Sequence, residues 1–229
     1  MKLPSIEQML KAGMHFGHRT SKWHPKMAPF IFTSRKGIYI IDLSKTRIKL
    51  KEALEFTEKL VAENKTILFV GTKNQVKVPL GELAKATNMP FVTGKWLGGF
   101  LTNFMVVKRS IRKYMDLVRQ KESGKLDKYT KKERLNFDRE IGKLDMKVGG
   151  LVNLTKLPDA IFVWDVRKER TAVAEARKKN IPIIAICDTN VNPELVNYVI
   201  PANDDATKTI DLVLDAFKET MLEAKKKQK

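Results

Sequence analysis

The sequence predicts an α/β protein in which helices flank a parallel sheet and an antiparallel helical hairpin is inserted into the chain. The first observation is the stretch 158–190, where short apolar runs at 160–164 and 181–187 enclose a helical pattern over 168–179. Two β-branched runs on either side of about three helical turns are typical of a right-handed βαβ unit, which requires a parallel sheet. The second observation is a charged region, 102–147, whose apolar residues recur at helical spacing for longer than one crossover helix.

Composition limits the class of protein. The chain has 229 residues, enough to bury a core, and 43% of them are hydrophobic. Its 44 lysines and arginines exceed its 26 acidic residues by 18, which indicates a polyanionic partner. The single cysteine, Cys187, excludes an intramolecular disulfide, and no apolar run approaches the roughly 20 residues of a membrane helix. We therefore expect a cytoplasmic protein without membrane association.

The N-terminal region is expected to combine a short helix with a basic, aromatic segment. Ser5 suits the N-cap of that helix and Gly13 suits its end. The segment 14–42 then holds all three histidines, several aromatic rings and five basic residues before its first acidic residue, Asp42. Rings interleaved with cations suit an RNA surface, because rings stack on exposed bases while lysine and arginine meet phosphates.

The main sheet is expected to begin directly after this segment. Residues 38–42 are predicted as its first strand, and Ser44 as the N-cap of the helix that follows. Residues 66–70 are predicted as the second strand, and 90–93 as the third. Between these two strands, Pro79 removes an amide donor and crowds the preceding turn, so we expect the crossover helix to be interrupted there.

A helical hairpin is predicted after the double glycine Gly98-Gly99, with Thr102 or Asn103 as the first helix cap and a capping box from Thr130 to Glu133 at the second. Each helix carries four apolar or aromatic residues spaced four, three and four apart, as in a coiled-coil seam: Val107, Ile111, Tyr114, Val118, and Phe137, Ile141, Leu144, Val148. We expect the hairpin to occupy 102–149 and the α/β body to comprise 1–101 and 150–229.

The body is expected to close with a strand and a helix. Pro193 suits the first position of a short helix, and residues 197–201 are predicted as the last strand. Asn203 or Asp204 is predicted to cap the final helix, whose apolar residues recur along one face: Ile210, Val213, Leu214, Phe217.

The histidines offer a possible metal site. His15 and His18 form an H-x-x-H pair with His24 nearby, and neutral imidazoles bind zinc. The pair lacks the adjacent glutamate of a zincin, and the only cysteine lies far along the chain. We therefore expect no metal there, and histidines that satisfy turns or touch RNA.

Three carboxylates support an alternative interpretation, in which the protein is an enzyme. Asp42, Asp165 and Asp188 each end a predicted strand, where ligands bind in open α/β sheets, and together they could hold magnesium for phosphoryl transfer. The simpler interpretation is that Asp165 caps the helix after it and Asp188 lies in a turn. Neither G-x-G-x-x-G nor G-x-x-x-x-G-K-[ST] occurs, so no nucleotide cofactor is expected.

The positive charge is concentrated in two segments. Residues 1–53 hold 11 lysines and arginines against 3 acidic residues, and residues 105–150 hold 14 against 7. Because most of the excess lies in the N-terminal segment and the hairpin, the distribution favours a nucleic-acid surface over an evenly solvated exterior.

Three long blocks resemble a known family: GMHFGHRTSKWHPKMAPFIFTSRKGIYIIDLSKT, GKWLGGFLTNF and PDAIFVWDVRKERTAVAEARKKNIPIIAICDTNVNPELVNYVIPANDDA. They are similar to the bacterial ribosomal protein S2 family of the small subunit, over nearly the whole chain. The resemblance implies a Rossmann-like α/β body with an inserted coiled coil and no enzymatic activity. Two departures are Pro79, where the family runs its helix unbroken, and a short basic C-terminus in place of an acidic extension.

The same resemblance implies the partners. They are small-subunit ribosomal RNA, neighbouring ribosomal proteins and the large ribosomal protein S1, with no homo-oligomer. A free RNA-binding regulator stays open as a second alternative. The residues expected to contact RNA are Arg19, Lys22, Trp23, His24, Lys26, Arg35, Lys36, Lys95, Arg109, Arg112 and Lys113.

Overall fold

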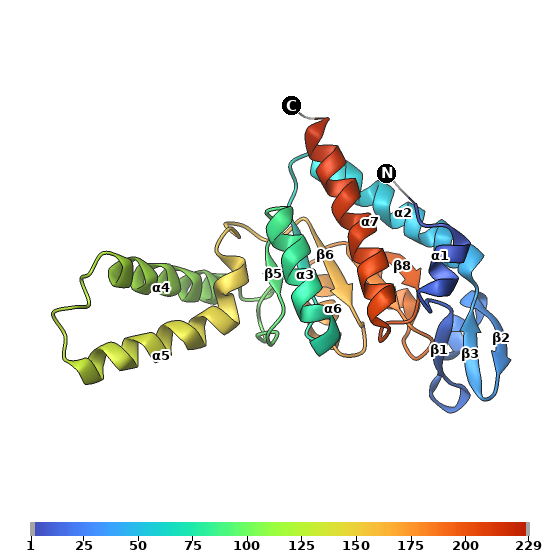
Figure 1. The fold of residues 1–229 in the computed structure, drawn as a ribbon, viewed down its shortest axis with the longest axis horizontal. Helices are drawn as coiled ribbons and strands as arrows, with labels where there is room; N and C mark the ends of the chain where they lie inside the picture. The colour runs from blue at the N-terminus through green and yellow to red at the C-terminus, as the bar shows by residue number, and fades with distance from the viewer. Residues whose placement is uncertain (1–2, 228–229) are drawn as a thin grey trace.

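A five-stranded parallel sheet forms the centre of the computed structural model, which describes residues 3–227 (Figure 1). Its strand order is β5-β4-β6-β7-β8 and every pairing is parallel. The strands are β4 (Ile67–Val70), β5 (Phe91–Val92), β6 (Ala160–Trp164), β7 (Ile183–Cys187) and β8 (Tyr198–Pro201). All residues of β4, β6 and β7 are buried, as expected of a sheet covered on both faces. The α/β class and the βαβ unit are confirmed.

Helices cover the two faces of this sheet with separate apolar cores. One face packs against α1 (Ile6–Lys11), α2 (Leu43–Ala62), α3 (Asn74–Ala86) and α7 (Thr207–Lys226). The other packs against α6 (Arg170–Lys178) and against apolar residues near the base of the hairpin. No helix within residues 3–227 combines the length and the hydrophobicity that crossing a membrane requires.

The strand expected at 38–42 does not belong to the main sheet, so that prediction is wrong. β3 (Ile38–Ile41) is the middle strand of a separate antiparallel sheet, between β1 (Phe16–Arg19) and β2 (Ile31–Arg35). Lys36 and Gly37, with φ of 50° and 75°, form the two-residue turn between β2 and β3. Two positive φ angles match the twist of a hairpin, and such a short loop favours antiparallel pairing with the neighbour in sequence.

Short 3-10 helices complete the N-terminal segment and the end of the body. η1 (Thr20–Lys22) and η2 (Pro25–Phe30) connect β1 to β2, and η4 (Pro193–Leu195) precedes β8. Pro193 occupies the first position of η4, as predicted.

Two helix ends differ from expectation. Asp42, rather than Ser44, caps α2, since its Oδ1 accepts the amide of Ser44 at 2.9 Å. Asn203 binds the amides of Asp205 and Ala206 instead of capping α7, which begins after Ala206 without a side-chain cap. In both places the sequence offers more than one polar side chain, within two or three residues, that could cap the helix. Only the path of the backbone decides which side chain reaches which amides.

Pro79 lies inside α3 without ending it, which contradicts the predicted interruption. A proline at this position removes one intrahelical donor, whose acceptor would have been the carbonyl of Gln75, an exposed residue. Val76 and Leu80, on either side of the proline, are fully buried in the core. Packing therefore holds the helix together through the missing bond.

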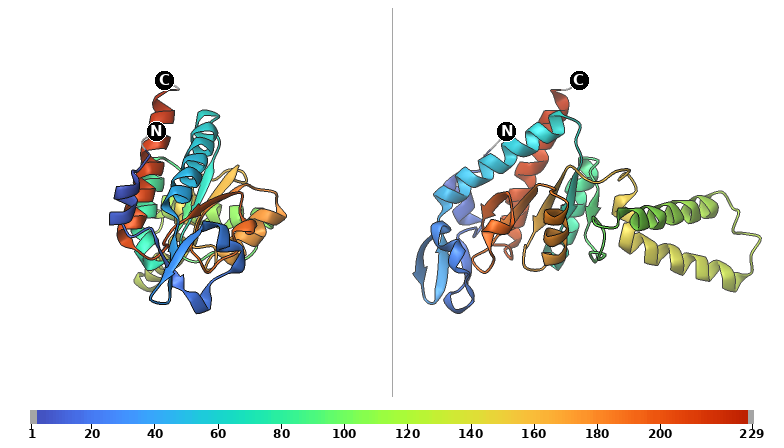
Figure 2. Two further views of the ribbon diagram at one scale, coloured as in Figure 1. Left: turned by 90° about the vertical axis from the view of Figure 1, so that its right-hand side faces the viewer. Right: turned by 180° about the vertical axis from the view of Figure 1, so that it is seen from behind.

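Two helices extend away from the sheet on one side of the molecule (Figures 1 and 2). They are α4 (Phe104–Glu122) and α5 (Lys131–Val148), which pack against each other, and η3 (Gly149–Leu151) follows them. The capping box of α5 is confirmed: the Thr130 amide donates to Glu133 Oε2 at 2.9 Å, and the Glu133 amide donates to Thr130 Oγ1 at 3.4 Å. The coiled-coil character of the pair stays a prediction.

Candidate nucleic-acid interface

Four of the predicted N-terminal RNA contacts are exposed cations on and beside the three-stranded sheet. Arg19 and Arg35 end strands β1 and β2, Lys22 ends η1, and Lys36 lies in the β2–β3 turn. All four are exposed, and within residues 3–227 none of them makes an ion pair. Their charges therefore face solvent, where a phosphate backbone could reach them.

The other three predicted residues of this segment are engaged by the protein itself. The Trp23 ring packs against Tyr39 with centroids 5.0 Å apart. His24 Nδ1 accepts the amide of Lys26 at 3.2 Å, and the Lys26 ammonium pairs with Glu194. All three residues therefore make contacts within the protein that help to hold the conformation of the segment.

The hairpin and the loop before it hold the remaining candidates. Arg109, Arg112 and Lys113 lie exposed on α4, and Lys95 lies exposed after β5. Lys113 pairs with Glu140 of α5 at 2.5 Å, while the other three make no ion pair with any described residue. The cations of the hairpin and those of the three-stranded sheet lie at opposite ends of the molecule (Figures 1 and 2). The structure does not gather the predicted residues into one patch.

A cluster of charged residues lies where the parallel strands end, and we call it the carboxyl-edge cluster: His18, Lys73, Asp165, Asp188, Asp204 and Asp205. The Lys73 ammonium is its centre, 3.1 Å from Asp165 Oδ2, 2.7 Å from Asp204 Oδ1 and 2.8 Å from Asp205 Oδ1. Lys73, Asp165 and Asp204 follow strands β4, β6 and β8. Carboxyl ends of parallel strands meet at one edge of a sheet, which brings these residues together.

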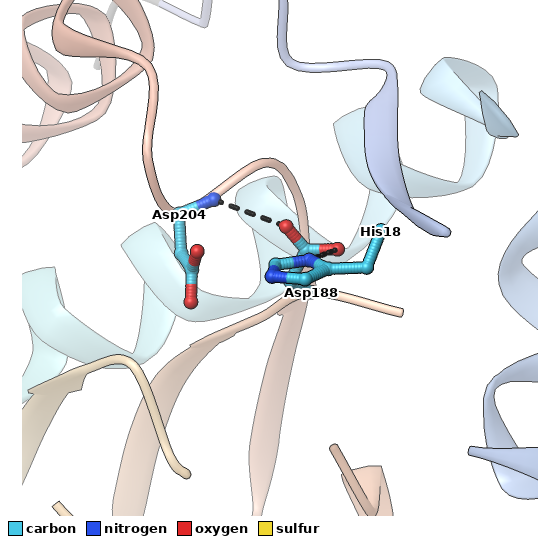
Figure 3. Close-up of side chains that lie close together, drawn as sticks. All are labelled: His18, Asp188 and Asp204. Carbon is cyan, nitrogen blue, oxygen red and sulfur yellow. Dashed lines mark hydrogen bonds and ion pairs between the residues drawn. The ribbon is translucent and has the colours of Figure 1, made fainter. Parts of the chain in front are cut away.

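His18 connects the N-terminal segment to this cluster (Figure 3). Its Nδ1 lies 3.1 Å from Asp188 Oδ1, and its backbone amide donates to Thr189 Oγ1 at 2.8 Å. A Cβ at Gly17 would lie 2.5 Å from the methyl carbon of Thr189, so only glycine permits this approach. The contact fastens β1 to the end of β7.

Burial, hydrogen bonds and neighbouring charges shift three pKa values in the cluster. Burial acts to lower the pKa of the Lys73 ammonium, but its acidic partners outweigh burial and raise that pKa. The hydrogen bond to Asp188 is the main cause that raises the pKa of His18. Burial, and then the charges of Asp188 and Asp165, raise the pKa of Asp204 to about 7, although Lys73 opposes the shift. The cluster therefore changes its protonation near neutral pH.

The three carboxylates of the enzyme alternative do not all lie together. Asp42 caps α2, whereas Asp165 and Asp188 lie in the carboxyl-edge cluster and act on Asp204. Asp165 also does not cap α6: its Oδ1 accepts the amides of Arg167 and Lys168, and its φ is 72°. The physical reason is that β3 belongs to the other sheet, so Asp42 is not at the edge where β6 and β7 end.

The group of described residues that could hold a cation is different from the three histidines that the sequence places close together. Ligand atoms of His18, Asp188 and Asp204 lie within 4.8 Å of one another, and neither His15 nor His24 belongs to this group. The sequence carried one unused signal for Asp204 and Lys73. Both residues follow predicted strands, and ligand-binding residues concentrate at such positions in open α/β sheets. The capping pattern at Asp204 has a simpler interpretation, and Lys73 lies in no recognised motif.

Glu175 holds the loop that contains the double glycine. Its carboxylate accepts the Trp96 indole N–H at 3.0 Å and the amides of Gly99, Leu101 and Thr102 at 2.8, 2.8 and 3.1 Å. Burial acts to raise the pKa of Glu175, but these hydrogen bonds outweigh it and lower the pKa. Three amides of the loop are thus bound by Glu175, and Lys95 is an exposed cation of this loop.

Comparison with known proteins gives a near full-length match. The family model described as Ribosomal protein S2 matches residues 9–224. Small ribosomal subunit protein uS2 of Chlorobaculum tepidum is 48% identical over 220 residues, 96% of this chain and 88% of that protein. Small ribosomal subunit protein uS2 of Coprothermobacter proteolyticus is 45% identical over 225 residues, 98% of this chain and 84% of that protein.

Proposed function

The chain belongs to the ribosomal protein S2 family, and we propose that it is a structural constituent of the small ribosomal subunit. The single observation that carries this proposal is the identity of 45–48% to proteins named small ribosomal subunit protein uS2, over nearly the full length of both chains. The place of action is then the small subunit in the cytoplasm.

The mechanism is neutralisation of RNA charge by two separated cationic surfaces. On the three-stranded sheet Arg19, Lys22, Arg35 and Lys36 are exposed, and on the hairpin Arg109 and Arg112 are exposed, all without an ion pair among the described residues. Binding such residues to RNA releases condensed counterions, so affinity falls as salt rises. Because the surfaces lie at opposite ends of the protein, it can bridge two RNA segments or two partners.

The finer features follow from the family and from the charge pattern. The hairpin, 102–149, acts as a unit inserted into the body, 1–101 and 150–229. The protein is not an enzyme and acts as one copy, and its neighbours are ribosomal RNA, other small-subunit proteins and ribosomal protein S1. The carboxyl-edge cluster supports a structural role, because its carboxylates are engaged by Lys73 and His18.

Sedimentation of the tagged protein through sucrose gradients tests the proposal. We expect it to travel with small ribosomal subunits in near-stoichiometric amount at low salt and to be released at high salt. A variant carrying Arg19→Gln, Lys22→Gln, Arg35→Gln and Lys36→Gln should be released at lower salt than the wild type. The matched control is Lys178→Gln, Lys179→Gln, Lys208→Gln and Lys218→Gln, which removes the same charge from α6 and α7. Wild-type protein that stays at the top of the gradient at low salt would contradict the ribosomal role.

A further inference from the structure

An open groove of about 950 Å³ lies where the hairpin joins the body, and we call it the root groove. Its walls come from α3, from β5 with the residues after it, from the end of α5 and from η3. Five lysines line it and one acidic residue, Asp145, does so: the lysines are Lys77, Lys85, Lys95, Lys143 and Lys147. The groove therefore brings together lysines from two stretches that are far apart in the sequence, 77–95 and 143–147.

These lysines have no ion-pair partner among the described residues. Within residues 3–227 none of the five makes an ion pair or a side-chain hydrogen bond, and Asp145 is already the acceptor of the Tyr114 hydroxyl at 2.6 Å. Further along the hairpin the pattern is the reverse, since Lys113 pairs with Glu140 and Lys121 with Asp138. Converging unpaired cations repel one another, and a bound polyanion relieves that repulsion.

The root groove has fixed walls and a partly apolar lining, and we call the apolar residues of that lining its floor. A Cβ on Gly94 would lie 2.5 Å from the Met146 carbonyl oxygen, and one on Gly150 would lie 2.4 Å from the Phe91 carbonyl oxygen. The backbones of the body and the hairpin thus meet directly at both glycines, which gives the groove its shape before any ligand arrives. Apolar residues contribute to the lining between the lysines: Met89, Phe91, Val92 and Val152.

The groove suits a nucleic-acid strand better than a peptide. A peptide that binds beside a sheet adds a strand to an open edge. Here β5 is the edge strand and is only two residues long, and Gly150 of η3 packs against its Phe91 carbonyl. The charged residues that line the groove are also mainly lysines, which suit the phosphates of a nucleic acid.

We propose that the root groove binds the backbone of an unpaired RNA segment, with its lysines on the phosphates and its apolar floor under a base or ribose. Cationic grooves that track the backbone beside apolar stacking surfaces are the usual means of holding single-stranded RNA. This inference rests on the proposed function and deepens it, because it assigns RNA contact to a third surface between the two cationic ends.

The test uses small subunits that lack this protein and the full-length chain added back. The groove variant carries Lys85→Gln, Lys95→Gln, Lys143→Gln and Lys147→Gln, and the control is the Lys178, Lys179, Lys208 and Lys218 glutamine variant described above. Binding is measured across a series of salt concentrations. Each lost phosphate contact lowers the slope of log affinity against log salt by about 0.7 to 0.9, so the groove variant should lose about 3 in slope while the control keeps the wild-type slope.

Photocrosslinking identifies the occupant directly. A benzophenone side chain installed in place of Met146, which is 71% exposed and lines the groove, should crosslink to ribosomal RNA in the reconstituted particle. Crosslinks to protein alone would assign the groove to an acidic peptide and overturn the inference. Equal slopes for the groove variant and the control would also overturn it and leave the ribosomal role intact. Wild-type protein that fails to bind the particles would overturn the proposed function and, with it, this inference.

Discussion

The N-terminal segment and the hairpin both carry excess positive charge, but different kinds of interaction attach them to the body. The segment is held by titratable groups, through His18 on Asp188 and the Thr189 contacts at the carboxyl edge of the sheet. The hairpin is held by backbone contacts at Gly94 and Gly150 and by the loop that Glu175 organises. The comparison teaches that similar charge composition does not imply a similar attachment. The segment depends on the His18–Asp188 contact, which titrates near neutral pH, whereas the hairpin depends on close backbone packing and on a carboxylate whose pKa is lowered.

Replacing Glu175 should have the largest effect, because it removes the attachment of the hairpin loop. Glu175→Ala leaves the Trp96 indole and three loop amides without their acceptor, and buried unsatisfied donors cost about 1 to 3 kcal/mol each when they cannot reach water. We expect a loss of about 3 to 5 kcal/mol in the free energy of unfolding, measured by urea denaturation.

Glu82→Ala is the control for Glu175→Ala, since Glu82 is an exposed glutamate of α3. Its effect should stay within about 0.5 kcal/mol. If the two variants lost equal stability, the loop would not depend on the Glu175 carboxylate, and the account of the hairpin attachment would be wrong.

A methyl group at Gly150 tests the steric part of the same attachment. Gly150→Ala places a Cβ 2.4 Å from the Phe91 carbonyl oxygen, so the hairpin must shift away from β5. We expect a loss of about 2 to 4 kcal/mol in unfolding free energy. Gly142→Ala is the matched control, because nothing lies within 4 Å of its Cβ inside α5, and it should stabilise the protein by about 0.5 to 1 kcal/mol.

The smallest of these effects concerns the pH dependence of the N-terminal attachment. Asp204 binds its proton more tightly in the folded state, so its contribution to stability falls as pH rises from its unfolded pKa of 3.8 to its folded pKa of about 7. His18, with a raised pKa, acts in the same direction, because the stability it contributes below pH 6.5 is lost as pH rises through its folded pKa. The groups that face these two are Lys73, Asp165, Asp188 and Asp205.

Asp204→Asn should flatten this pH dependence. We expect the variant to gain about 1 to 3 kcal/mol in unfolding free energy relative to wild type at pH 8, with the difference shrinking toward pH 4. Denaturation at several pH values measures it. Asp205→Asn serves as the control, since its carboxylate also contacts Lys73 but its side chain is 56% exposed. A pH profile that Asp204→Asn leaves unchanged would show that Asp204 does not contribute to the pH dependence.

Local pattern predicted the elements that local interactions stabilise. The βαβ unit, the capping box at Thr130 and Glu133 and the inner face of α7 follow from periodicity and capping chemistry, which operate within a few residues. The long N-terminal and C-terminal blocks were also sufficient to identify the family. Charge composition alone located the two cationic segments.

Choices that depend on distant parts of the chain needed the tertiary structure. The local propensity of β3 allows it to pair in either sheet, and the competition between these pairings decides that it joins the antiparallel sheet. Helix α3 continues through Pro79 because the residues on either side of the proline are buried in the core. The carboxyl-edge cluster joins His18, Lys73 and Asp204 across most of the chain, and the root groove joins lysines from α3 and α5. Sequence alone indicated most of the helices, the strands of the parallel sheet and the two cationic segments. The fold alone decided which side chains meet, because contact between remote residues is set by packing and topology and leaves no local pattern.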